Sequence, residues 1–211
     1  MGTTKALAEY EKKLRKMSER EMSSDQELSK NTAHEIYKNA TDGKSVLVSE
    51  SDYPEIWNFM KGKTKTVPSI RIVENAIPFS LGDSNKHEIV VTTSFLRARK
   101  QEEINAHLLH QALEMSWGGE GSSIYVERVR NNLLMDERVA QQVGTDALMS
   151  DIQLTQKEKD KIEIEMLPDE VKRKAKQTGD SIHDHTLGIP SAGERIAHLN
   201  ELVTKGKVRA K

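Results

Sequence analysis

The β-branched segments of this chain all lie before residue 94, and the rest of the chain has helical periodicity. Segments 67–73 and 88–93 are rich in valine, isoleucine and threonine, which predicts a β-hairpin or two strands of a small antiparallel sheet, separated by a polar turn at 82–86. A short strand is also predicted at 46–48. The helical pattern continues over 94–99, 101–116, 124–149, 155–166, 168–178 and 191–204. Strands grouped apart from helices predict a mostly helical α+β fold rather than the alternating α/β class.

The first part of the chain is predicted to be helical as well. Residues 4–22 have a narrow apolar stripe on an otherwise charged helix, formed by Leu7, Tyr10, Leu14 and Met17. A second helix follows, and Asp42 and Gly43 end it. We therefore expect residues 1–45 to form an attachment or partner surface, residues 46–204 to form one domain, and residues 205–211 to be a solvated basic tail.

The charge balance and the residue types exclude several functional classes. The 32 lysines and arginines nearly cancel the 33 aspartates and glutamates, so no single-sign field would attract nucleic acid or an anionic bilayer. The absence of cysteine excludes disulfides and thiol nucleophiles. No integral membrane segment is predicted, because no apolar run approaches the roughly 20 residues that span a bilayer. The charged N-terminus lacks the apolar core of a signal peptide, which predicts a cytoplasmic or other intracellular soluble compartment.

The segment from Asn75 to Glu114 is the most informative part of the chain. Asn75-Ala76, the strand IVVTT at 89–93 and the sequence EEI at 102–104 occur in the order and spacing found in one family of zinc metallopeptidases. Asp136-Glu-Arg-Val-Ala is similar to that family's E-x-x-A-D-R-x-A helix, and Pro190-Ser-Ala-Gly-Glu-Arg-Ile to its H-P-x-x-x-E-R-I element. Over roughly 67–204 the chain thus resembles the HtpX/CAAX-prenyl-endopeptidase family, which implies a zincin-like domain.

The residues that would perform zinc chemistry in that family are mostly replaced here. In the family's H-E-x-x-H motif, two histidines one helical turn apart bind zinc, and the glutamate acts as general base. The resemblance places His110 at the first histidine, Gln111 at the general base and Glu114 at the second histidine. It places Leu133 at the third ligand and Ile189 where a histidine often precedes the proline. Only His110 is retained.

These replacements predict a catalytically inactive metallopeptidase-like protein, a pseudo-peptidase. A neutral amide cannot take a proton from water, so Gln111 removes a contribution of about 10²–10⁴ to the rate. Leucine at position 133 has no ligand atom. We therefore expect no zinc cofactor and no hydrolysis of an unstructured protein such as casein. If a natural glutamate had been replaced by Gln111 through engineering, that one replacement would be explained. The replacements at Glu114 and Leu133 would not be.

A divergent zinc metalloendopeptidase is the alternative. His107, His110 and Glu114 share one helix face, and Asp136 or Glu137 on the next helix could complete an unusual ligand set. The competing interpretation is that both histidines are partly buried polar residues, with Glu114 paired to one of them. His183 and His185 also have two interpretations, as a pair of metal ligands or as solvated histidines of a loop.

A pseudo-peptidase retains its peptide groove. In the family, substrate lies along an edge strand of the sheet, and the resemblance assigns that role to Ile89, Val90, Val91, Thr92 and Thr93. We accordingly expect the chain to be a protein-binding or structural subunit. Its partner would be another protein, a larger assembly or further copies of the same chain. The resemblance also implies that the helix near 101–116 packs on the helix near 124–149, with His110 facing Leu133.

Overall fold

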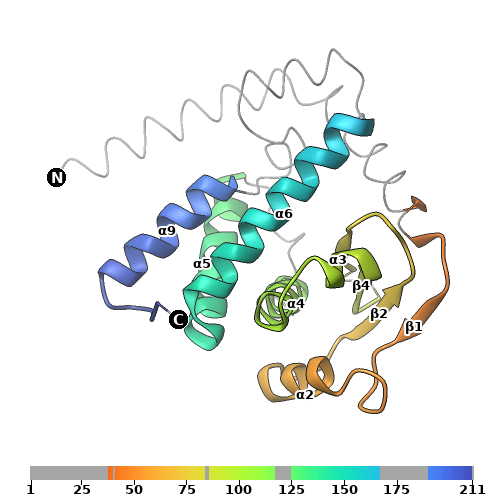
Figure 1. Cartoon of the computed structure of the whole chain (residues 1–211). Helices are drawn as coiled ribbons and strands as arrows, with labels where there is room; N and C mark the ends of the chain where they lie inside the picture. Colours follow the sequence, from red (N-terminus) through yellow and green to blue (C-terminus); the bar gives the residue numbers. More distant parts are fainter. Residues whose placement is uncertain (1–37, 40, 84–85, 117–124, 167–189, 211) are drawn as a thin grey trace.

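The computed structural model describes residues 38–39, 41–83, 86–116, 125–166 and 190–210. Within them, one small sheet and a larger set of helices confirm the α+β class (Figure 1). The predicted helices at 4–22 and 168–178 lie outside the described residues, as do Ile189, His183 and His185. No helix among the described residues has the length and apolar character needed to cross a membrane.

The sheet has four strands in the order β1-β2-β4-β3: β1 Ser45–Leu47, β2 Ser69–Val73, β3 Ser80–Asp83 and β4 Glu88–Thr92. The outer pairs are antiparallel, but β2 and β4 run parallel, so the sheet is mixed rather than antiparallel. The observed hairpin joins β3 to β4, not β2 to β4. Strand β3 occupies part of the stretch predicted to be a turn.

The assignment of the peptide-binding edge to Ile89, Val90, Val91, Thr92 and Thr93 is wrong. The first four residues belong to β4, which is paired on one side with β2 and on the other with β3. Both rows of its backbone hydrogen-bonding groups therefore lie inside the sheet. Thr93 begins the next helix.

Six helices accompany the sheet in the described part of the chain: α2 Pro54–Lys63, α3 Thr93–Arg97, α4 Gln101–Ser116, α5 Tyr125–Val143, α6 Thr145–Met166 and α9 Ala192–Thr204. The predicted single helix at 124–149 is divided, because Gly144 has a φ of 89°, which is outside the helical region and suits glycine. Helix α9 begins with a capping box in which Ser191 and Glu194 satisfy each other's backbone N–H groups.

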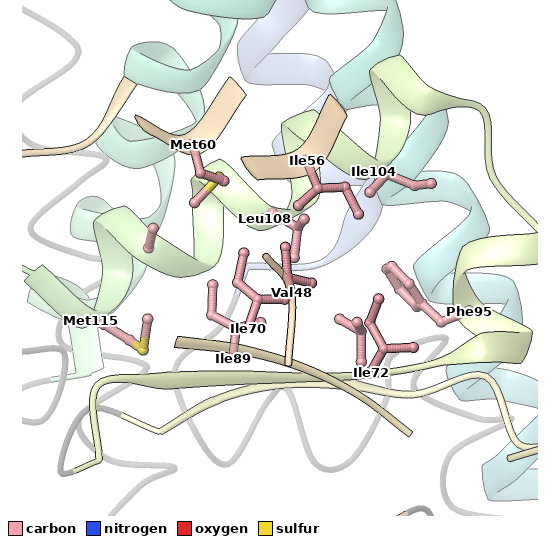
Figure 2. Packing of buried hydrophobic residues seen from close by; sticks show 12 residues of the cluster. Val48, Ile56, Met60, Ile70, Ile72, Ile89, Phe95, Ile104, Leu108 and Met115 are labelled. Atoms are coloured by element: carbon pink, nitrogen blue, oxygen red, sulfur yellow. The ribbon is translucent and has the colours of Figure 1, made fainter. Parts of the chain in front are cut away.

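Helix α4 lies between the sheet and the helices α5, α6 and α9 (Figure 1). One face of α4 packs with α2 on the sheet, and Figure 2 shows Leu108 of α4 meeting Ile70 and Ile89 of the sheet, with Met60 of α2 above. The other face contributes Leu109 to a second apolar cluster with α5, α6 and α9. Because both faces of α4 are covered, its polar side chains are partly or fully buried, except for Glu102 and Ser116 near its ends.

The C-terminal residues 205–210 are exposed, as expected of a solvated end, except for Val208, which is buried. Gly206 has a φ of 68° and turns the chain back after α9. Val208 then packs in the cluster of α5, α6 and α9, and the carbonyl of Arg209 accepts a hydrogen bond of 3.3 Å from the N–H of Thr145. The basic composition of this segment did not indicate that Val208 would be buried. This valine holds the segment against the start of α6.

Candidate functional site

The two histidines of α4 are buried and point to different helices. The exposed fractions are 8% for His107 and 9% for His110. The first histidine pairs with Asp151 of α6, and the second with Asp136 of α5. A spacing of three residues on a helix places side chains on neighbouring parts of one face, and here the packed helices α5 and α6 receive one each.

His107 belongs to a buried network that joins α3, α4 and α6. Its Nδ1 lies 2.8 Å from Oδ2 of Asp151, whose Oδ1 accepts a hydrogen bond of 2.7 Å from Nε of Arg99. Arg99 also donates from both terminal nitrogens to the two oxygens of Glu158, at 2.7 and 2.8 Å. The guanidinium lies 3.6 Å from the ring centre of Phe95, which in turn contacts the His107 ring. The network therefore satisfies a fully buried arginine with two carboxylates and an aromatic face.

The electrostatics of this network favour its charged form. Burial alone would raise the pKa of Asp151, but His107 and Arg99 outweigh it and leave the pKa below its ordinary value. For Arg99, burial opposes the charge, whereas Glu158 and Asp151 raise the pKa above its ordinary value. Both groups are therefore held ionised at neutral pH.

His110 belongs to a second network of a histidine, an aspartate and an arginine, which joins α4, α5 and α9. Its Nε2 lies 3.1 Å from Oδ1 of Asp136, a side chain with no exposed surface. Arg195 of α9 donates to both oxygens of Asp136, at 2.6 and 2.8 Å. Burial would raise the pKa of this carboxyl, but Arg195 and His110 together hold it well below its usual range. A bidentate arginine thus fixes the carboxylate that faces His110.

Helices α4 and α5 pack together as predicted, but the residue opposite His110 is Asp136 and not Leu133. Leu133 lies one turn earlier on α5 and is only half-buried. An ion pair between Asp136 and Arg195 thus lies opposite His110, where the resemblance implied Leu133.

The other two polar residues of the degenerate motif do not join the histidines. The side chain of Gln111 lies against β3, where its Oε1 would be 2.6 Å from a Cβ added to Gly82. Glu114 is half-buried, and among the described residues both histidines pair with aspartates instead of with it. Glu137 accepts a hydrogen bond from Gln141 on its own helix. The expected pairing of Glu114 with a histidine is therefore wrong.

The described side chains do not fit a catalytic zinc site. Such a site needs three protein ligands directed at one point. In the described ranges no three histidines or carboxylates come together in this way. His107 has one feature of metal-binding histidines, since its Nδ1 contacts a carboxylate while its buried Nε2 has no hydrogen-bond partner within the described part of the chain. The directions of His107 and His110 toward different helices nevertheless separate the two imidazoles.

The two ion-pair networks lead to a pH prediction for stability. The pKa values of Asp136 and Asp151 are lower in the folded chain than the value of about 3.9 expected in the unfolded chain. Their stabilisation is therefore complete above the unfolded value and is lost as the pH falls toward the folded values. Each carboxylate should contribute a slope of up to about 1.4 kcal/mol per pH unit in that window.

Urea denaturation at a series of pH values between about 5 and 3 measures this slope. Asp136→Asn should unfold at lower urea concentration at pH 5 and show a shallower decline toward pH 3 than the wild-type chain. Equal slopes for the two proteins would contradict a lowered pKa at Asp136.

The sheet leaves two edges beside this helical site. Strand β3 lies at one edge next to α4, and β1 lies at the other, with no further strand beyond either in the ranges described. Strand β3 was not predicted from the sequence, because its Gly82 and Asp83 have low strand propensity. Comparisons with protein-family models, with curated proteins and with solved structures give no significant match to this chain.

Proposed function

We propose that the chain is a non-catalytic, metallopeptidase-like module that binds an extended segment of a partner protein along strand β3. The observation that carries the proposal is the position of β3, an edge strand directly beside the helix that bears the degenerate motif. Adding a strand to a sheet edge requires main-chain hydrogen bonds and side-chain pockets, and no metal ion.

The backbone of β3 offers the hydrogen-bonding groups that such a segment needs. The N–H of Thr92 donates to the carbonyl of Phe79, and the register places Leu81 opposite Val90 in the next hydrogen-bonded pair. In an antiparallel pair the alternate residues direct their N–H and C=O groups away from the partner strand. Ser80 and Gly82 therefore present these groups toward the outer edge.

The side chains near β3 support the same use. Leu81 is 40% exposed, which is high for a leucine in a strand. The hydroxyl of Ser80 is buried and has no hydrogen-bond partner among the described residues. The amide of Gln111 lies against Gly82 and can donate or accept hydrogen bonds without changing charge. An incoming segment would thus meet an apolar contact on one face and polar groups on the other.

A selection of peptides from a random library on the full-length protein tests the proposal. Peptides that use β3 should protect the amides of Ser80 and Gly82 from hydrogen exchange. Ser80→Pro removes one outward N–H without removing a β3–β4 hydrogen bond, and we expect it to weaken binding by about tenfold. Ser45→Pro, on the opposite edge, is the matched control and should leave binding at β3 unchanged.

The proposal fails if no selected peptide protects β3, or if Ser80→Pro binds as tightly as the wild-type chain. Protection of β3 in the isolated protein, accompanied by a dimer in sedimentation, would instead identify the chain as a structural homo-oligomer.

A divergent zinc metalloendopeptidase is the second candidate, and one observation favours it. The contact between His107 and Asp151 leaves a buried imidazole nitrogen available, as in histidines that bind metals. This candidate requires further ligands for a metal bound to Nε2 of His107. Measuring the zinc content of the protein distinguishes the metalloendopeptidase from the peptide-binding module.

A further inference from the structure

The edge strand at the opposite side of the sheet, β1, is the most apolar exposed element of the described chain. All three residues of β1 are exposed, and the fractions for Val46 and Leu47 are 50% and 58%. The third large hydrophobic side chain with such exposure among the described residues is Leu81 of β3. Both edge strands thus expose apolar side chains.

The backbone of β1 is arranged to pair with one more strand. The N–H of Val48 donates to Ile70, and the N–H of Glu74 donates to Lys44, so residues 44, 46 and 48 face β2. Ser45 and Leu47 consequently direct their N–H and C=O groups outward. No described strand lies beyond them.

A pocket open to solvent lies beside this edge. Its lining includes Leu47, Trp57, Val67 and Pro68, which makes it mainly apolar. The indole N–H of Trp57 is buried and has no hydrogen-bond partner within the described part of the chain. Trp57 thus contributes to the pocket lining, while its N–H is closed to solvent.

The charge next to the pocket indicates what kind of segment would fit. Lys61, Lys63 and Lys65 are exposed and precede Val67 in the chain. The last turn of α2 holds two of them. None of the three forms an ion pair with another described residue. The end of α2 and the residues after it therefore provide positive charge that acidic residues of a partner would complement.

We propose that β1 is a second docking site, which takes an extended peptide segment of another protein with an apolar side chain followed by acidic residues. The segment adds a strand beside Ser45 and Leu47. Its apolar side chain enters the pocket lined by Trp57, Val67 and Pro68, and its acidic residues meet the lysines. The site is separate from the one proposed at β3, because the two edges are divided by β2 and β4.

A synthetic peptide of alternating threonine and leucine that ends in three glutamates is the probe. NMR titration of the ¹⁵N-labelled full chain should shift the indole N–H of Trp57, assigned with Trp57→Phe, together with the amides of Ser45 and Leu47. Ser45→Pro should weaken binding by about tenfold, and replacing the glutamates of the peptide by lysines should do the same. Ser80→Pro should bind the probe as the wild-type chain does, which keeps this test independent of β3.

Four outcomes would overturn the proposal. One is the absence of any shift at Trp57 up to millimolar peptide, and another is a set of shifts confined to β3. A dimer of the full chain that Ser45→Pro dissociates would show that a second copy occupies the edge. Amides of Ser45 and Leu47 already protected from exchange in the monomeric, peptide-free chain would show that its own residues cover it.

Discussion

Replacing Arg99 by methionine is expected to lower the free energy of unfolding by about 3–5 kcal/mol. The side chain of Arg99 has no exposed surface and neutralises both Asp151 and Glu158. Methionine fills much of the same space but leaves two carboxylates near each other with no guanidinium between them. The loss should therefore come from uncompensated charge rather than from a cavity.

Urea denaturation at neutral pH measures this loss, and Arg97→Met is the matched control. Arg97 is exposed two residues earlier on α3. The control should change the unfolding free energy by less than about 0.5 kcal/mol. If the two variants were equally stable, Arg99 would not connect α3 to α6 in solution.

Replacing Leu108 by alanine is the second change with a large expected effect, a loss of about 2–5 kcal/mol. Leu108 is fully buried where α4 packs on the sheet. Leu109, the next residue, is equally buried on the side of α5, α6 and α9, and its replacement should cost a similar amount. The reason is that α4 contributes fully buried side chains to both apolar clusters.

Leu133→Ala provides the comparison for these two variants. Leu133 is half-buried, so its truncation should cost clearly less than that of Leu108. Denaturant midpoints for the three variants decide the order. A loss at Leu133 as large as the loss at Leu108 would mean that Leu133, and not Asp136, lies against α4.

Local patterns in the sequence were enough to predict many of the elements but not their pairing. The β-branched segments predicted β2 and β4, and helical periodicity predicted α4 and α9. The parallel pairing of β2 with β4 depends on contacts distant in sequence, which no local pattern encodes. The break between α5 and α6 rests on one residue, Gly144, whose positive φ a periodicity argument does not detect.

The candidate site was predicted in part. The resemblance identified His110 and the segments that contain Asp136 and Arg195. It did not predict that Asp136 and Arg195 form an ion pair. Arg99 and Asp151 were missed altogether, because they are 52 residues apart and belong to no recognisable motif. Buried ion pairs of this kind arise from the packing of whole helices, so only the three-dimensional structure reveals them.

Two aspartates hold the histidines of α4, and this arrangement is the basis for a binding role in place of a zinc-dependent one. Asp151 and Asp136 are in turn fixed by Arg99 and Arg195, so each histidine faces a carboxylate that is already bonded within the protein. Moving either imidazole toward a shared metal would disrupt one of these buried contacts. The cost of such disruption is the physical reason for expecting weak metal binding.

The zinc content of the purified full-length chain, measured by elemental analysis after equilibration with excess zinc and removal of free metal, tests this account most directly. We expect far less than one equivalent per chain, with no change in His107→Ala or His110→Ala. Zinc close to one equivalent that either substitution removes, together with casein cleavage that a chelator abolishes, would contradict the account and establish the metalloendopeptidase instead.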